Sequence, residues 1–131
     1  MSQILVVDDD PDILHLLTAM FECIGHQVCV TPDPDDVRPL LEKRRFDLMV
    51  LDIMLPRRSG WEILEELRGN PCTEQLPVIM LSASGDPANR ARGLRLGAND
   101  FLAKPFDPDE LIARVEGLLA RRASTPVLPG C

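Results

Sequence analysis

The sequence predicts an α/β protein with one doubly wound sheet of five parallel strands. Five short apolar runs alternate with five segments of helical spacing along the 131 residues. The runs have no polar face, which is typical of parallel strands that are covered by helices on both sides. Alternation of this kind produces right-handed strand–helix–strand crossovers. The length is that of one domain, because single domains most often have about 100–150 residues.

The elements follow one another in a regular order. Strands are expected at residues 4–7, 28–30, 48–51, 78–81 and 101–103. Helices are indicated by apolar residues at helical spacing: Ile13, Leu14, Leu17, Phe21 and Ile24 in the first; Leu40 and Leu41 in the second; Trp61, Ile63, Leu64 and Leu67 in the third; Ala91, Leu94 and Leu96 in the fourth; Leu111, Ile112, Val115, Leu118 and Leu119 in the fifth.

Turn and cap residues agree with these boundaries. Asp-Pro pairs at residues 10–11, 86–87 and 107–108 are typical of a helix cap followed by the first helical residue. Gly97 should end the fourth helix. Pro34 and Pro39 predict a short or kinked second helix. Residues 1–122 are expected to form the domain, and residues 123–131, with two prolines and a glycine, a linker or C-terminal tail.

Composition and charge exclude several classes of protein. The chain has 14 Lys+Arg against 21 Asp+Glu, a net charge of −7, which argues against direct nucleic-acid binding. It has no apolar run near the ~20 residues of a membrane span, and its N-terminus lacks the basic region of a secretory signal. The four cysteines form no CxxC pair. A reduced, cytoplasmic location is therefore expected.

Polar residues follow four of the five predicted strands. Three aspartates at residues 8–10 follow the first, Asp52 the third, Ser82 the fourth and Lys104 the fifth. In the strand order 2-1-3-4-5, strands one and three are neighbours at the point where the order reverses, and ligands bind beyond the carboxyl ends there. These side chains are therefore expected to meet in one crevice.

The residue types in this crevice indicate a chemistry. Asp10 is explained as a helix cap, but Asp8 and Asp9 have no such structural role, and Asp52 by itself could be an ordinary loop acid. Gathered carboxylates raise one another's pKa unless a cation neutralises them, and hard oxygen ligands suit Mg²⁺. Lys104 adds a partner for an anionic ligand. The set suggests a phosphoryl group that meets Mg²⁺ at a carboxylate.

Four motifs then carry a resemblance to a known family. They are VVDDD at residues 6–10, VLDIMLP at 50–56 with Gly60, MLSA at 80–83 and GANDFLAKPF at 97–106. Over residues 3–121 the sequence resembles the receiver domains of two-component response regulators. The resemblance implies a flavodoxin-like (βα)₅ fold, which agrees with the number of elements found above.

The resemblance also implies a role for each motif residue. Asp52 would be the phosphoacceptor for a sensor histidine kinase or phosphotransfer protein. Asp8, Asp9, Asp52 and the backbone carbonyl of Met54 would hold Mg²⁺, for which Mn²⁺ can substitute.

The other motif residues would bind and sense the phosphoryl group. Lys104 and Ser82, with Ala83 beside it, would contact the phosphoryl group, and the Lys104–Pro105 bond would be cis. Phe101 stands where tyrosine is common in the family. It would report the modification by turning inward as Ser82 moves.

A charged set near the C-terminus resembles a dimer face. Its members are Asp100, Glu110, Arg114, Arg121 and Arg122. Receivers attached to winged-helix DNA-binding domains pair through this face, whereas residues 93–102 are equally similar to receivers attached to cyclic-dinucleotide synthases. A solvated helix face with a Glu110–Arg114 pair is the alternative that needs no partner. The output domain or effector therefore stays open.

Three other functions compete with a phosphoacceptor. Asp8 and Asp10, two residues apart after the first strand, resemble the start of haloacid-dehalogenase-type phosphatases. Membership of that family would not explain Asp52 and Lys104. A flavin-binding carrier needs a hydroxyl- and glycine-rich loop where this chain has acids. A receiver fold that signals by protein contact without phosphorylation remains the main alternative.

Overall fold

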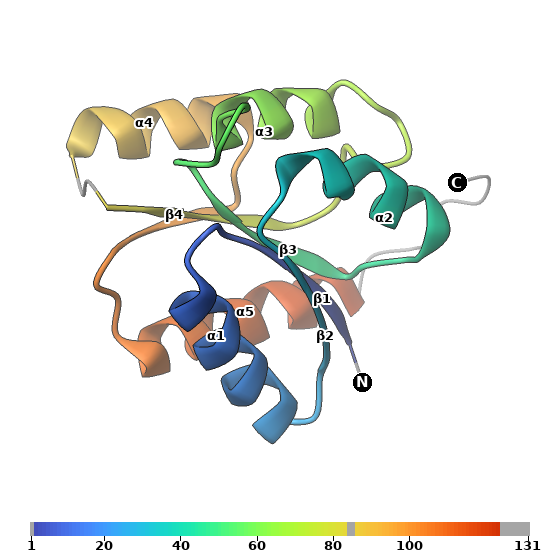
Figure 1. Cartoon of the computed structure of the whole chain (residues 1–131), viewed down its shortest axis with the longest axis vertical. Coiled ribbons are helices and arrows are strands. Elements are labelled where there is room, and N and C mark those ends of the chain that lie inside the picture. The colour runs from blue at the N-terminus through green and yellow to red at the C-terminus, as the bar shows by residue number, and fades with distance from the viewer. Residues whose placement is uncertain (1, 84–85, 124–131) are drawn as a thin grey trace.

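The computed structural model describes residues 2–83 and 86–123, and these form one sheet covered by helices (Figure 1). The elements are β1 (Gln3–Val7), α1 (Pro11–Cys23), β2 (Gln27–Thr31), a 3₁₀ turn η1 (Pro34–Asp36), α2 (Val37–Lys43), β3 (Leu48–Asp52), α3 (Gly60–Arg68), β4 (Val78–Ser82), α4 (Pro87–Leu96), β5 (Asp100–Ala103) and α5 (Pro108–Ala123). The strands are parallel in the order β2-β1-β3-β4-β5. The predicted fold class and strand order are confirmed.

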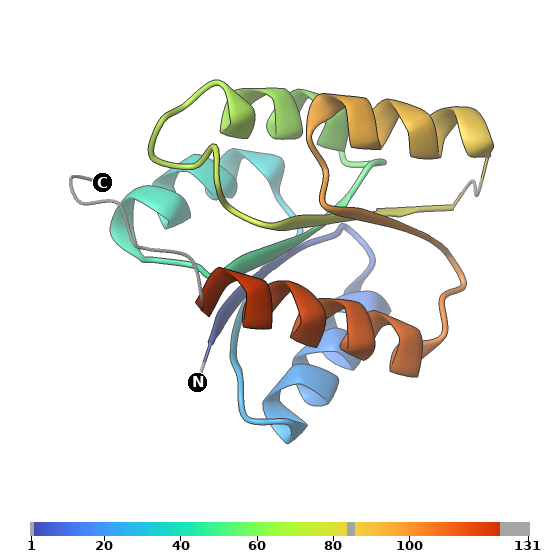
Figure 2. The same cartoon turned by 180° about the vertical axis from the view of Figure 1, so that it is seen from behind.

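Helices cover both faces of the sheet. Helices α1 and α5 lie on one side, and α2, α3 and α4 lie on the other (Figures 1 and 2). Alternate residues of β1 enter the two cores: Ile4 and Val6 pack with the α1 and α5 side, Leu5 and Val7 with the other. Because all four are fully buried, β1 has no polar face, which explains its continuous apolar run.

Helix boundaries follow the predicted cap residues. Asp10, Asp86 and Asp107 each accept a hydrogen bond from the backbone N–H two residues ahead, at 2.8–2.9 Å. Gly97 ends α4 in the left-handed conformation, with φ 103°. These interactions satisfy backbone groups that a helix end leaves without partners.

The second helix is short, as its prolines predict. A 3₁₀ turn that starts at Pro34 leads into α2, which has seven residues. Pro39 lies in the first turn of α2, where its missing N–H breaks no hydrogen bond within the helix. The prolines therefore shorten this helix without interrupting it.

The C-terminal helix continues through Ala123, the first residue of the predicted linker or tail. Residues 124–131, the remainder of that tail, lie outside the described residues. Within the described part of the chain, no helix is both long enough and apolar enough to cross a membrane.

Candidate functional site

The carboxyl edge of the sheet brings together residues that are far apart in the sequence. Asp8 directly follows β1, Asp52 and Ser82 are the last residues of β3 and β4, and Lys104 directly follows β5. The Lys104 Nζ lies 2.8 Å from Asp8 Oδ2 and 3.4 Å from Asp52 Oδ2. Strands β1 and β3 are neighbours only because the strand order reverses there. The reversal therefore creates the convergence that the sequence predicts.

Burial sets the electrostatics of this cluster. The Asp8 and Asp52 side chains are 1% and 4% exposed, and Lys104 is 20% exposed. Burial raises the pKa of Asp52 to about 6, and the charge of Asp8 adds to this rise, although Lys104 and the Met54 N–H oppose it. Two carboxylates share one ammonium, so the cluster is negative when both are ionised.

Lys104 experiences two opposed effects. Its burial by itself lowers the pKa of the ammonium, because the charged form loses water. The hydrogen bond to Asp8 and the charges of Asp52 and Asp8 outweigh this loss and raise the pKa above its usual value. Lys104 is therefore a permanent positive charge at neutral pH.

Three carboxylates at this edge could hold a metal ion. Asp8, Asp9 and Asp52 each offer an oxygen atom, and these atoms lie within 4.8 Å of one another. Asp8 Oδ1 also accepts a hydrogen bond from the Asp10 N–H at 2.9 Å, which orients its carboxylate. An all-oxygen set on which Asp9 is exposed fits a hard divalent cation such as Mg²⁺, which keeps several of its waters.

The loop after β3 begins inside the site. The Met54 N–H donates to Asp52 Oδ1 at 3.2 Å, while Met54 as a residue is 69% exposed. A Cβ on Gly60 would lie 2.4 Å from the Asp52 carbonyl oxygen, so only glycine allows α3 to start this close to Asp52. The Gly60 N–H closes the loop by donating to the Ile53 carbonyl at 2.8 Å.

Ser82 ends β4 beside the charged cluster, level with Ala103, and Phe101 lies two residues earlier on β5. Ser82 is buried, whereas Ala83 beside it is exposed, and the Ser82 carbonyl accepts a hydrogen bond from the Lys104 N–H at 2.7 Å. Phe101 is buried in the core, and a Cβ on Gly93 would lie 3.3 Å from its ring. Phe101 thus already occupies an inward position in this structure. The Lys104–Pro105 peptide bond is cis.

The predicted dimer face is only partly assembled within one chain. Arg114 pairs with Asp100 at 2.6 Å and with Glu110 at 2.9 Å. Arg122 contacts Asp47 and the carbonyl of Gln75 instead, and so lies apart from that cluster. Arg121 is exposed on α5. The Glu110–Arg114 pair of the alternative interpretation is present.

Sequence reasoning missed a second charged cluster at the same edge. Arg57 in the β3–α3 loop pairs with Asp33 and Asp35, which follow β2. Acids that follow a parallel strand are expected at the carboxyl edge of the sheet, and this rule applies to Asp33 and Asp35 after β2 as it does to Asp8 and Asp52. The position of these two acids in the sequence could therefore have indicated the cluster. Nothing in the sequence indicates that Arg57 is the partner of these acids, because its position in a loop does not show which side chains it contacts.

Comparison with known proteins identifies the family. Residues 4–116 match the model of the response regulator receiver domain. The chain is 43% identical over 121 residues to the transcriptional regulatory protein CpxR of Escherichia coli, with 92% of this chain and 50% of CpxR aligned. It is 43% identical over 128 residues to the phosphate regulon transcriptional regulatory protein PhoB of Rhizobium meliloti, with 98% and 56% aligned. The chain spans about half the length of these curated relatives.

Solved structures agree with this assignment. The receiver domain of the Francisella response regulator 1452 superimposes with a TM-score of 0.87 at 36% identity, covering 92% of this chain and 98% of that one. The chemotaxis protein CheY4 of Vibrio cholerae gives a TM-score of 0.84 at 26% identity, with 90% and 98% covered. This chain therefore belongs to the response regulator receiver domain family of two-component systems.

Proposed function

We propose that this domain accepts a phosphoryl group on Asp52 from the phosphohistidine of a sensor histidine kinase or phosphotransfer protein. The observation that supports this most directly is the buried pair Asp8 and Asp52 around Lys104. Phosphoryl transfer needs an in-line nucleophile and charge neutralisation more than an acid or a base. With a pKa of about 6, the Asp52 carboxylate is mostly ionised at pH 7 and above, so it is available as the nucleophile.

In the proposed transfer, an Asp52 oxygen attacks the phosphorus and the phosphorus–nitrogen bond to the donor histidine breaks. The electron pair of that bond stays on the imidazole, and Asp52 becomes an aspartyl phosphate. Lys104, now between Asp8 and Asp52, would pair with a phosphoryl oxygen. Its position next to the acceptor supports this role, because the group brings about −1.5 to −2 charges.

The metal would be held by Asp8, Asp9, Asp52 and the backbone carbonyl of Met54. Mg²⁺, or Mn²⁺ in its place, would neutralise the phosphoryl charge beside the carboxylates. The oxygen atoms of the three aspartates are close enough to share one ion. Lys104 supplies the remaining positive charge from the protein itself.

The signal would pass from Ser82 and Ala83 to Phe101. Ser82 and Ala83 would meet a phosphoryl oxygen on Asp52, and the position of Ser82 at the end of β4, the strand next to β3, supports this role. Phe101 is already inside, so phosphorylation would stabilise this inward side chain rather than create it. The readout would be the face formed by α4, β5 and α5, which carries the Arg114–Asp100 pair and would serve as a homodimer face.

The output would lie outside this chain. The relatives at 43% identity are named transcriptional regulators, which favours transcription over cyclic-dinucleotide synthesis as the controlled process. Residues 1–122 would be the receiver, and residues 123–131 a linker or C-terminal tail. The receiver itself, with a net charge of −7, would not contact nucleic acid.

Intact-mass measurement after incubation with acetyl phosphate and Mg²⁺ tests the proposal. The wild-type chain should gain the mass of one phosphoryl group, and Asp52→Asn should gain none. Asp107→Asn is the matched control, because Asn keeps the cap of α5, and it should gain the group like wild type. Lys104→Ala should retain partial labelling. A wild-type chain that gains no mass would instead favour a receiver that signals through protein contact alone.

A further inference from the structure

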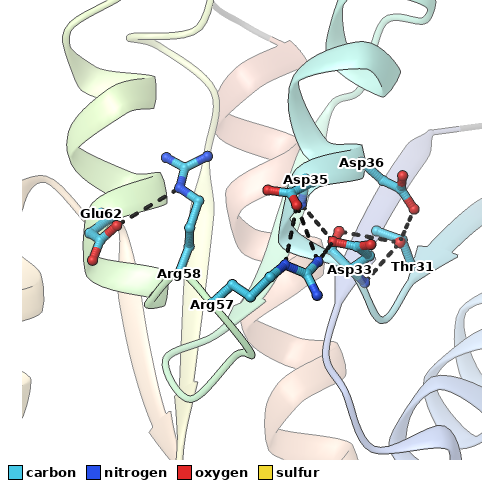
Figure 3. Close-up of polar contacts among 7 residues, drawn as sticks. All are labelled: Thr31, Asp33, Asp35, Asp36, Arg57, Arg58 and Glu62. Carbon is cyan, nitrogen blue, oxygen red and sulfur yellow. Dashed lines mark hydrogen bonds and ion pairs between the residues drawn. The ribbon is translucent and has the colours of Figure 1, made fainter.

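Two neighbouring arginines, Arg57 and Arg58, form ion pairs from the loop that follows β3 (Figure 3). Arg57 reaches across to Asp33 and Asp35, in the segment between β2 and α2. Arg58 turns the other way and pairs with Glu62 and Glu66 of α3, the helix into which the loop leads. Of these two arginines, Arg57 is the one that pairs directly with the segment between β2 and α2, whereas Arg58 approaches α2 only through Glu66, which also pairs with Arg38 at 2.9 Å.

The backbone at Arg57 is in an uncommon conformation. Its φ is 65°, and among the described residues it is the one non-glycine with a positive φ. Glycine adopts this region at no steric cost, whereas a residue with a Cβ is strained there. An arginine at this position suggests that its side chain compensates for the strain through its contacts.

The guanidinium of Arg57 meets two carboxylates at once. It pairs with Asp33, and it lies 3.2 Å (Nη2) and 3.3 Å (Nε) from Asp35 Oδ2. The two acids are held relative to each other, because the Asp35 N–H donates to Asp33 Oδ1 at 2.9 Å. The planar fork of arginine is suited to such a pair, and lysine is not equivalent.

The acids are in turn anchored next to the carboxylates that could hold the metal. The Asp33 N–H donates to Thr31 Oγ1 at 3.1 Å, and that hydroxyl donates to Asp36 Oδ2 at 2.8 Å. Thr31 is buried, and its carbonyl accepts the N–H of Asp8 at 3.2 Å. The partners of Arg57 are thus connected to Asp8 by a short series of hydrogen bonds.

The other end of the loop is Asp52 itself. The loop starts there, passes Met54 two residues later and reaches Arg57 three residues after that. Met54 is held by its N–H bond to Asp52, and the stretch up to Gly60 makes a closed turn through the Gly60–Ile53 hydrogen bond. Because only Leu55 and Pro56 separate Met54 from Arg57, a change of backbone conformation at Arg57 would pass to Met54 through a short stretch of chain.

We propose that Arg57 is a positioning residue for the divalent cation: with Asp33 and Asp35 it holds the β3–α3 loop so that the Met54 carbonyl faces Asp8, Asp9 and Asp52. The proposal rests on the proposed function, since it takes the Met54 carbonyl as a metal ligand. Outer contacts that orient a ligand contribute measurably to metal affinity, even though they never touch the ion.

The test measures Mn²⁺ binding alone, by counting free Mn²⁺ with electron paramagnetic resonance at low ionic strength. Arg57→Asn should weaken Mn²⁺ binding about threefold, the scale of a pair of exposed ion pairs. Asparagine tolerates positive φ, so the variant removes the contacts without adding strain. Charge alone makes the opposite prediction, because removing a positive group near a cation site should tighten binding. The sign of the change therefore separates positioning from simple electrostatics.

Two further variants sharpen the test. Arg58→Asn removes the same charge one residue away, together with the pairs to Glu62 and Glu66 of α3, and should leave Mn²⁺ affinity equal to or tighter than wild type. The double variant Asp33→Asn/Asp35→Asn keeps the local turn but removes the two carboxylates that pair with Arg57. These two substitutions should weaken Mn²⁺ binding more when Arg57 is present than when they are combined with Arg57→Asn. The difference between wild type and Arg57→Asn should also shrink as NaCl is raised, because the pairs are exposed.

The possible outcomes are distinct. Unchanged or tighter binding in Arg57→Asn, or equal weakening in Arg58→Asn, overturns the positioning role. If the wild-type chain takes up a phosphoryl group and the Arg57 variants match it in Mn²⁺ affinity, this inference fails and the proposed function stands. If the wild-type chain takes up no phosphoryl group, the proposed function itself fails, whatever Arg57 does.

Discussion

Two clusters at the same edge of the sheet have the same ingredients in different surroundings. Each has two aspartates around one basic side chain: Asp8, Asp52 and Lys104 form the buried cluster, and Asp33, Asp35 and Arg57 form the exposed cluster. The side chains of the buried cluster are 1–20% exposed, and those of the exposed cluster are 41–59% exposed.

The comparison shows that burial, more than composition, decides what such a cluster can do. In the buried cluster, loss of water raises the pKa of Asp52 to about 6, so the ionised form is held at a cost that a bound cation would relieve. In the exposed cluster, water and salt already screen the charges. The surroundings of the first agree with the binding of a metal and a phosphoryl group proposed above, and those of the second with the proposed holding of the loop.

The largest effect is expected from removing the cation of the buried cluster. Lys104→Met leaves two buried carboxylates facing each other and should lower the free energy of unfolding by about 3 kcal/mol at pH 8. Urea unfolding without Mg²⁺ measures this change. The same substitution at Lys43, the other lysine of the chain and an exposed one, should change stability by less than about 0.5 kcal/mol. Equal losses of stability at the two lysines would contradict the conclusion that burial makes the charge of Lys104 important for the fold.

Asp52→Asn should raise the free energy of unfolding, the opposite of the effect of Lys104→Met. The folded-state pKa of Asp52 is about 6 against an ordinary value of 3.8, so the folded chain binds this proton more tightly than the unfolded chain does. Stability therefore falls as pH rises from about 4 to 6, and the ionised group destabilises the fold at all higher pH values. The variant should be about 2 kcal/mol more stable than wild type at pH 8, and about equal to it at pH 4.

Urea unfolding at a series of pH values, without Mg²⁺, measures that difference. Asp107→Asn is the control for loss of one exposed negative charge, and it should follow wild type at each pH. A variant that is no more stable than wild type at pH 8 would show that the buried cluster carries no unfavourable charge.

A divalent cation should neutralise the unfavourable negative charge of the buried cluster and so stabilise the fold. With Mg²⁺ at about ten times its Kd, the wild-type chain should gain about 1.4 kcal/mol of stability through ligand linkage. Asp52→Asn should gain clearly less, because one of the three carboxylates is gone. Thermal unfolding with and without Mg²⁺ measures both, and equal gains in the two proteins would exclude Asp52 from the cation site.

The smallest effect is expected at the exposed cluster. Arg57→Asn should change Tm by about 2 °C or less, because exposed ion pairs contribute little to global stability and the substitution also relieves backbone strain. Thermal unfolding at low and high NaCl measures this. A large loss of Tm would show that the exposed cluster supports the fold as well as the loop.

Much of the fold follows from local patterns in the sequence. The run at residues 4–7 is apolar throughout because both faces of β1 are buried, so a strand could be recognised from a few residues. Asp10-Pro11 marks the start of α1 because an aspartate cap and a proline at the first position act locally. Pro34 and Pro39 predict a short second helix for the same reason.

The charged site is predictable only in outline. That Asp8, Asp52 and Lys104 meet follows from a general rule about the carboxyl ends of parallel strands. Their state does not: the pKa of Asp52 depends on how completely α-helices and loops exclude water, which no local pattern reports. Similarly, Phe101 was expected to turn inward on phosphorylation, yet it is already buried.

The sequence by itself determined the order of elements, their boundaries to within about a residue and the set of residues at the strand ends, since caps, prolines and apolar runs act over a few neighbouring residues. Tertiary structure alone decided that Gly60 must lie against the Asp52 carbonyl, that Arg57 finds Asp33 and Asp35, and that water is excluded from one cluster and not from the other. These outcomes depend on which segments meet through space, and the free energy of a charge depends on that environment.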